Sequence, residues 1–236
     1  MDGRELVLVY ETEAACLSRL IAQGFEPRDA RAIASYLAQS TDLAPEFDAI
    51  GDECGRRGLA FAAVELDDVA AALADRVPER TLVWTLTDGI AYFRGSAAPA
   101  LARLRGMRTF GSEDSLFALC QDKFRSGAVL GALGLPTPAA GLARDGVWLA
   151  EPPASPGGWF VKPNRLGAKI GIWADSHVRS PEAALELSRR IFAAYRDDAL
   201  VQAYVPGRNV RASYLAVDRD AGAEALGAVF VDSGSD

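Results

Sequence analysis

The sequence is poor in the residues that build metal, redox and disulfide sites. It contains 1 histidine and 3 cysteines among 236 residues. Cys16, Cys54 and Cys120 lie far apart and form no Cys-x-x-Cys pair, which argues against a zinc motif and suits a reducing compartment. A multi-histidine metal site is excluded, and a histidine-based triad would have to use His177. His177 lies in a polar segment before Pro181, which favours a solvated loop position.

Long apolar runs and an excess of positive charge are also absent. No run approaches the roughly 18 residues of a membrane span, and the segment that begins at Met1 lacks the basic and then apolar layout of a signal peptide. The net charge of −7 opposes a general attraction to nucleic acid or to an anionic membrane. We therefore expect a soluble cytoplasmic protein without nucleic-acid or membrane partners, although a local basic pocket is compatible with this charge.

The first 113 residues alternate apolar runs of strand length with amphipathic helical patterns. The expected strands cover residues 6–10, 59–66 and 81–86, and the expected helices cover residues 13–23, 28–39, 45–57 and a short stretch before Pro78. This alternation predicts a Rossmann-like, doubly wound parallel sheet. No Gly-x-Gly-x-x-Gly follows the first strand, so the dinucleotide fingerprint is absent. A scaffold role is favoured for this half, with small-molecule binding as the alternative. Asp88 is either a substrate contact or a turn-forming residue beside Gly89.

The second half predicts helices packed on antiparallel hairpins. A single long helix is expected from Ser112 to Gly134, followed by a loop with one short strand at residues 147–149. Pro181 begins a helix that runs to Tyr195, since proline is favoured at the first helical position. The later strands are expected at residues 200–205, 210–217 and 225–231.

One segment, residues 159–172, has the features of a phosphate-binding loop. An apolar run that starts at Trp159 leads to Lys162, and Pro163 ends the strand. Gly167 and Gly171 bracket the following turn, where backbone amides can approach an anion closely. An ordinary surface hairpin has the same local pattern, so this motif needs support from elsewhere in the chain.

Two further motifs provide that support. Asp122-Lys123 lies within the expected long helix, and residues 200–209 read Leu-Val-Gln-Ala-Tyr-Val-Pro-Gly-Arg-Asn. With Val161-Lys162-Pro163 between them, their order and spacing resemble ATP-grasp ligases of the D-alanine:D-alanine ligase-like group. The resemblance implies a Rossmann-like domain at residues 1–113, an α+β ATP-grasp domain whose first subdomain covers residues 114–198, and the start of its second subdomain at residues 199–236.

The resemblance also implies roles for individual residues. Lys123 and Lys162 would contact the ATP phosphates as the catalytic cations, although a solvated helix lysine and an ordinary strand-end lysine are the alternatives. The glycine loop would cover the phosphates through Gly167, Ala168 and Lys169. The strand residues Gln202, Ala203, Tyr204 and Val205 would cross the adenine, and Asn209 falls where the family usually has a glutamate for the ribose. Tyr204 could equally be a packing residue.

Several positions depart from the family pattern. The loop reads Gly167-Ala168-Lys169 where D-alanine:D-alanine ligases have Gly-Ser-Ser. The neutral amide of Asn209 is a weaker acceptor than a carboxylate. The first strand lacks the glycine, serine and glutamate pattern that positions D-alanine. No Mg²⁺ ligand set is assigned, so we expect either a fragment of a longer ligase or a degenerate nucleotide-binding protein.

The implied activity is ATP-dependent joining of a small-molecule carboxylate to an amine through an acyl phosphate, with release of ADP and phosphate. ATP and Mg²⁺ are the implied cofactors, with the metal ligands outside the given chain. Homodimers through the first domain are usual in the resembled group. The alternative is a non-catalytic ATP-binding or assembly module without its own metal site.

Overall fold

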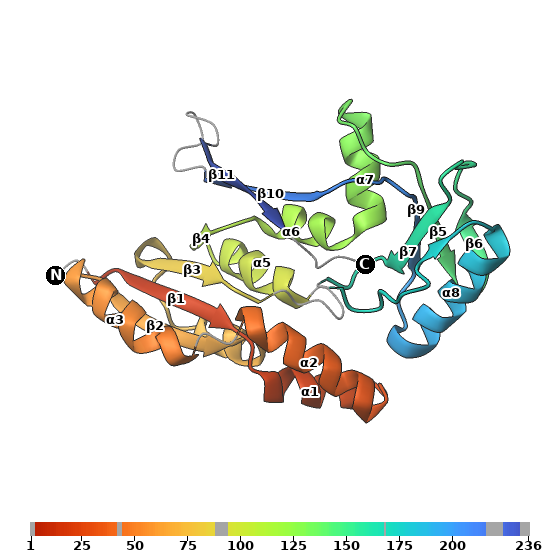
Figure 1. Ribbon diagram of the computed structural model, residues 1–236. Coiled ribbons are helices and arrows are strands. Elements are labelled where there is room, and N and C mark those ends of the chain that lie inside the picture. The colour runs from red at the N-terminus through yellow and green to blue at the C-terminus, as the bar shows by residue number, and fades with distance from the viewer. Residues whose placement is uncertain (1–2, 42–43, 88–93, 168, 216–223, 232–236) are drawn as a thin grey trace. The chain divides into compact units, whose positions relative to one another are not determined.

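A parallel four-stranded sheet forms the first part of the fold. The computed structural model describes residues 3–41, 44–87, 94–167, 169–215 and 224–231. The sheet has the order β2-β1-β3-β4, and each neighbouring pair is parallel. Its strands are β1 (Glu5–Tyr10), β2 (Ala60–Glu65), β3 (Thr81–Thr85) and β4 (Arg108–Phe110) (Figure 1). The predicted parallel sheet is confirmed, and β4 is a strand that the sequence did not predict.

Helices connect these strands and bury the sheet. They are α1 (Glu13–Ala22), α2 (Pro27–Thr41), α3 (Phe47–Arg56), α4 (Val69–Ala72) and α5 (Ala97–Leu104), with short 3-10 turns at Ala44–Glu46, Leu66–Asp68, Pro78–Arg80 and Arg94–Ser96. Val7, Val9 and Val83 pack against α4 and α5. Successive strand residues face opposite sides, so Leu8, which is fully buried, lies on the other side of the sheet.

A second, antiparallel sheet follows, with the order β6-β5-β9-β7-β8. Its strands are β5 (Ala140–Arg144), β6 (Val147–Ala150), β7 (Trp159–Pro163), β8 (His177–Val178) and β9 (Ala199–Ala203). The helix α8 (Pro181–Tyr195) covers one face, where Val161, Val201 and Ile191 are fully buried. The predicted start of α8 at Pro181 is confirmed, and Ser180 caps the helix. The exposed His177 lies in β8 rather than in a loop, since its backbone pairs with Phe160.

Strand β5 was missed because the sequence places glycine and alanine where a strand usually has branched residues. Gly141 lies in β5 against the chain that leaves β6. A Cβ at Gly141 would lie 2.5 Å from the Ala150 carbonyl oxygen and 2.5 Å from Pro152. The position therefore needs glycine because another backbone segment approaches it closely.

The predicted single helix from Ser112 to Gly134 is wrong. Two helices occupy this segment, α6 (Asp114–Gln121) and α7 (Lys123–Ala132). Asp122 separates them with an extended backbone, φ −102° and ψ 101°, and its carboxylate accepts a hydrogen bond from the Arg125 amide at 3.0 Å. Because aspartate is a strong helix N-cap, it ends one helix and begins the next. Lys123 consequently becomes the first residue of α7.

The segment after β7 is attached to the N-terminal helices. Leu166 is only 6% exposed and packs with Cys16, Ile33 and other residues of α1 and α2. The Arg196 guanidinium donates to the carbonyl oxygens of Gln23 and Gly24 at 2.6 and 2.7 Å. The predicted phosphate loop therefore shares a core with the first part of the chain.

The last strands form a separate unit. Contacts divide the chain into Met1–Ala203 and Tyr204–Asp236. In the second unit, β10 (Asn209–Leu215) pairs with β11 (Glu224–Val231) as an antiparallel hairpin with a register shift between Ser213 and Tyr214. The antiparallel hairpin expected there is confirmed, whereas the two boundaries between the three segments inferred from the sequence stay predictions.

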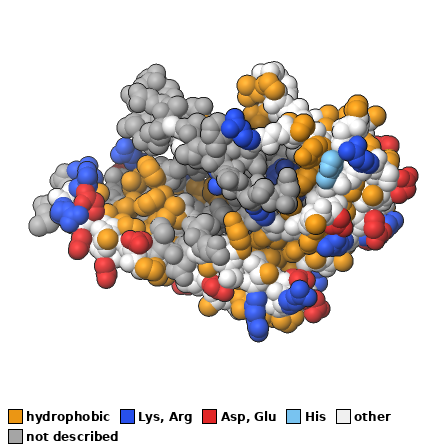
Figure 2. Space-filling model, in the orientation of Figure 1, with side chains coloured by type: hydrophobic (Ala, Val, Ile, Leu, Met, Phe, Trp, Pro, Cys, Tyr) orange, Lys and Arg blue, Asp and Glu red, His pale blue; other side chains and the backbone are white. Residues whose placement is uncertain are grey.

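The surface carries charge of both signs. On the face shown in Figure 2, acidic and basic side chains are interspersed among hydrophobic ones. Within the described residues, every helix is too short or too polar to cross a membrane.

We expect Leu166→Ala to lower the free energy of unfolding by about 2–4 kcal/mol, because it leaves a cavity in the core under the loop. Leu104→Ala is the matched control. Leu104 is 84% exposed, so its truncation should change stability by less than about 0.5 kcal/mol. Urea unfolding of both variants beside the wild type measures the difference. Equal effects of the two substitutions would show that Leu166 does not anchor the loop.

Candidate functional site

Lys123 connects the start of α7 to the predicted phosphate loop. Its backbone amide donates to the Asn164 carbonyl oxygen at 3.2 Å. Its side-chain Nζ donates to the carbonyl oxygens of Asn164 and Leu166 at 3.1 and 2.5 Å. An ammonium group has three donors, so one N–H remains for a ligand. Lys123 is therefore not the solvated helix lysine that was the alternative expectation.

Asn164 is a buried polar residue of the candidate site that the sequence analysis did not single out. It is fully buried, and its Oδ1 accepts a hydrogen bond from the Phe124 amide at 2.9 Å. The backbone N–H of Asn164 donates to the Asp198 carbonyl oxygen at 2.8 Å. The side-chain Nδ2 is buried and has no hydrogen-bond partner within the described part of the chain. Asn164 thus fixes the end of β7 to the start of α7 and keeps one donor unused beside Lys123.

Two adjacent acidic residues, Asp197 and Asp198, hold the start of the loop. The Arg165 amide donates to Asp197 Oδ2 at 2.7 Å. The Asp198 carboxylate accepts two bonds from the Arg144 guanidinium, at 2.6 and 3.1 Å. Both aspartates are almost fully buried. The sequence analysis did not single out these two residues. Two adjacent aspartates between a predicted helix and an apolar strand could have indicated a structural role.

The Arg165 guanidinium lies among three buried carboxylates. Its nitrogen atoms are 3.4 Å from Asp197, 3.5 Å from Asp198 and 3.8 Å from Asp122. With Arg144 and the two lysines, the cluster contains four cationic groups and these three carboxylates. The local excess of positive charge favours an anionic ligand.

Strand register places Lys162 and Gln202 on one face of the second sheet. Lys162 pairs with Leu200, and Phe160 pairs with Gln202. Directly paired residues share a face and successive residues alternate, so these four side chains lie on the face opposite α8. The structure therefore brings two of the predicted ligand residues to one surface. Among the described residues, no hydrogen bond or ion pair engages the Lys162 ammonium.

Both lysines are partly desolvated. The pKa of Lys123 is lowered to about 8, mainly by burial. The negative charges of Asp197 and Asp122 act in the opposite direction, and the positive charge of Lys162 lowers the pKa further. Burial also lowers the pKa of Lys162, and burial raises the pKa of Asp197. Because the two ammonium groups repel each other, an anion bound to both would lower the free energy of their charged forms.

The loop beyond Leu166 turns back tightly. Lys169 has a left-handed backbone, φ 65°, which is unusual for lysine, and its side chain is exposed. Gly171 also has a positive φ, and a Cβ there would collide with the Pro163 ring. Gly167 accepts a hydrogen bond from the Ile170 amide at 3.0 Å. The predicted residue Ala168 lies outside the described residues, as does Asp88.

The predicted adenine strand is only partly inside β9. Gln202 and Ala203 belong to β9, and the Ala203 amide already donates to the Ala139 carbonyl oxygen at 2.8 Å. Tyr204 and Val205 follow the strand and are 38% and 65% exposed. Asn209 begins β10, and its side chain is not among the described parts. The roles of these residues at a nucleotide stay predictions.

The use of lysine gives a signal that the sequence analysis missed. The chain has 25 lysine and arginine residues, but its lysines are only Lys123, Lys162 and Lys169. Arginine fills every other basic position. Lysine is a compact point charge, whereas arginine is a planar fork. Lysine thus occurs in this chain only at the candidate site.

The described residues do not form a metal site. No group of three or more histidine, cysteine or acidic side chains among them is placed to hold a metal ion. Mg²⁺ requires near-octahedral oxygen coordination, and the buried aspartates are engaged with arginines and backbone amides. These residues therefore do not fit Mg²⁺.

The lowered pKa of Lys123 predicts a pH-dependent stability. Its folded value of about 8 lies below its ordinary value of 10.5, so the unfolded chain binds more protons between these pH values. Stability contributed by this group should rise as pH increases from about 8 to about 10. Lys123→Met removes the titration. Urea unfolding at several pH values should show the wild type gaining stability relative to Lys123→Met across that range; parallel curves would contradict the assignment.

Comparisons with known proteins place the fold. No protein-family model matches the chain. An uncharacterized protein from Sinorhizobium fredii is 27% identical over 135 residues, which cover 57% of this chain and 39% of that protein. A D-alanine--D-alanine ligase from Dinoroseobacter shibae is 32% identical over 165 residues, which cover 68% of this chain and 50% of the ligase. The chain thus matches half or less of the length of these two curated relatives.

Solved structures resemble most of the chain. D-alanyl-alanine synthetase A from Vibrio cholerae has a TM-score of 0.60 and 15% identity, covering 100% of this chain and 70% of that one. D-alanine--D-alanine ligase from Bacillus anthracis, complexed with ATP, has a TM-score of 0.53 and 11% identity, and the match covers 89% of this chain and 62% of that one. L-amino acid ligase from Bacillus licheniformis has a TM-score of 0.55 and 12% identity, and the match covers 97% of this chain and 50% of that one. The chain therefore has the fold of D-alanine--D-alanine ligases, and its resemblance to the ATP-grasp superfamily is confirmed.

Proposed function

We propose that this protein is an ATP-dependent ligase that joins a carboxylate to an amine. The observation that carries the proposal is the convergence of Lys123 and Lys162 at the start of one loop. Their ammonium groups come from separate elements, α7 and β7, and Lys123 Nζ donates to the carbonyl oxygen of Asn164, two residues after Lys162. The similar D-alanine--D-alanine and L-amino acid ligases support this class of reaction.

The chain's residues would bind and orient the triphosphate. Lys123 offers its third N–H, and Lys162 offers an ammonium without another partner among the described residues. Charge-assisted hydrogen bonds of this kind are short and strong. Lys169 and Gly167 would cover the phosphates from the loop. Gln202 of β9 would contact the adenine.

The reaction needs positioning more than acid–base chemistry. A substrate carboxylate oxygen would attack the γ-phosphorus of ATP, and the bond to the bridging oxygen would break to release ADP. An amine nitrogen would then attack the acyl carbon, lose a proton and displace phosphate. Two lysines neutralise charge that spreads over the phosphate oxygens in such transfers. Because the described residues do not fit Mg²⁺, no step is assigned to a metal.

The substrates would be small molecules with a carboxylate and an amine. The first strand is followed by Glu11, Thr12 and Glu13, without the glycine and serine pattern that positions D-alanine in the resembled ligases. We therefore do not expect D-alanine to be the preferred substrate at either position. The non-catalytic alternative shares the ATP site but carries out neither the phosphoryl transfer nor the attack by the amine.

Calorimetric titration with ATP and Mg²⁺ tests the binding site. We expect saturable binding by the wild type, and affinities lower by about 10- to 100-fold for Lys162→Ala because one charged hydrogen bond is lost. Lys162→Arg should not restore wild-type affinity, since a planar guanidinium fits a compact ammonium site poorly. Arg189→Lys changes an exposed arginine of α8 and is the matched control. Wild-type affinity in Lys162→Ala would refute the assignment.

Turnover distinguishes the ligase from the binding module. ADP and phosphate release should depend on added amino acids when the protein is assayed in the form that the cell makes. Hydroxylamine added with a carboxylate should trap an acyl phosphate as a hydroxamate. Tight ATP binding without ADP formation across a panel of amino acids would instead support the non-catalytic module.

A further inference from the structure

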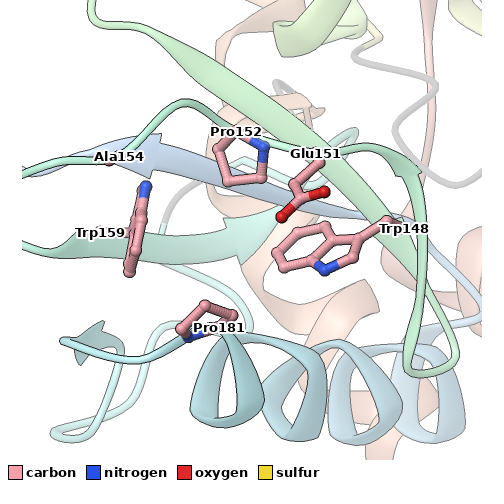
Figure 3. A pocket seen from close by; sticks show the side chains of 6 residues that line it. All are labelled: Trp148, Glu151, Pro152, Ala154, Trp159 and Pro181. Atoms are coloured by element: carbon pink, nitrogen blue, oxygen red, sulfur yellow. The ribbon is translucent and has the colours of Figure 1, made fainter.

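A small pocket lies between β6, the start of β7 and the start of α8. Its volume is about 150 Å³, and it is lined by Trp148, Glu151, Pro152, Ala154, Trp159 and Pro181. Figure 3 shows Trp159 on one side of the pocket and Trp148 with the Glu151 carboxylate on the other. A cavity of this size holds a benzene-sized molecule in other proteins.

This pocket is separate from the nucleotide site. Trp159 and Lys162 both belong to β7, but they are three residues apart and therefore face opposite sides of the sheet. Trp159 packs in the cluster under α8, together with Val161 and Ile191. An occupant of the pocket would thus lie across the sheet from Lys162, and the inference does not depend on the proposed ligase activity.

The walls of the pocket are fixed before any ligand binds. The Trp159 indole N–H donates to the Pro153 carbonyl oxygen at 3.2 Å, which holds the edge of the ring. Gly141 of β5 allows Pro152 to lie directly against the sheet. Proline side chains add rigid walls at Pro152 and Pro181. Little conformational entropy would be lost at Trp159 and the two prolines when a ligand enters, because these side chains are already held in place.

The lining attracts positive charge. Glu151 is exposed, and neither an ion pair nor a hydrogen bond engages its carboxylate within the described ranges. Another tryptophan, Trp173, already has a cation over its ring, since the Arg190 guanidinium lies 3.8 Å from the ring centre. Over the described residues, no arginine or lysine takes the same position at Trp148 or Trp159. The pocket thus offers two aromatic rings and a carboxylate without an internal cation.

We propose that this pocket binds a small organic ammonium ion. Aromatic faces attract cations that carry carbon substituents, and tryptophan is the strongest of the aromatic residues in this respect. The nearby Glu151 carboxylate adds a full charge of opposite sign. A hard metal cation suits the pocket less, because Mg²⁺ and Ca²⁺ require six or more oxygen ligands and the lining has one carboxylate.

Choline and its neutral isostere 3,3-dimethylbutan-1-ol test the proposal at constant ionic strength. The indole N–H signals of the ¹⁵N-labelled 236-residue chain report on each tryptophan separately. We expect choline to shift the signals of Trp148 and Trp159 saturably, and to leave Trp84 and Trp173 unchanged. The neutral isostere should bind at least about 5-fold more weakly, because it lacks the cation–π attraction. Equal binding of the two compounds, or no saturable shift with choline, would overturn the proposal.

Two substitutions then test the lining. Glu151→Gln should weaken choline binding about 3- to 10-fold while leaving the isostere unaffected. Glu79→Gln removes the same charge from an exposed position in the first sheet's connections and should have no effect. Trp148→Phe should retain part of the affinity and Trp148→Leu should lose it. If a Trp148 variant does not fold, the wild-type comparison of choline with its isostere still decides the question.

Discussion

The site depends on one partly buried ammonium group. Lys123 Nζ donates to two carbonyl oxygens of the segment that follows β7, and its backbone amide donates to one of the same carbonyl oxygens. These bonds fix α7 to the loop, and Leu166 fixes the loop to the core of α1 and α2. Since a buried ammonium needs hydrogen-bond acceptors, the loop backbone must remain where it is for Lys123 to stay charged.

The electrostatic arrangement around Lys123 favours an anion. Lys162 lies close enough to lower the pKa of Lys123, and burial lowers the pKa of both groups. The buried aspartates compensate the arginines and orient the loop backbone through Asp197. Lysine occurs in this sequence only at Lys123, Lys162 and Lys169. A chain that otherwise uses arginine has therefore placed all of its compact ammonium groups in or beside one loop.

The sequence predicted the elements that depend on local pattern. Continuous apolar runs predicted the parallel strands, and Pro181 predicted the start of α8. The break at Asp122 was missed because hydrophobic spacing continues through it, although the capping bond from the Arg125 amide to the Asp122 carboxylate is local. Asn164 and Asp197 were missed for a different reason, since their hydrogen-bond partners are distant in the chain. Motif order identified the two lysines, but not the bonds that hold them.

The most direct test uses the scarcity of lysine. A chain labelled with ¹³C and ¹⁵N at lysine should give three side-chain CεH₂ signals, one for each lysine, and their pH titration reports each pKa. The account predicts that Lys123 titrates near pH 8 without ligand. Saturating ATP should raise this value and shift the Lys162 signal, because phosphate stabilises the charged forms. Unchanged Lys123 and Lys162 signals in the presence of bound ATP would contradict the central claim that these two ammonium groups hold the triphosphate.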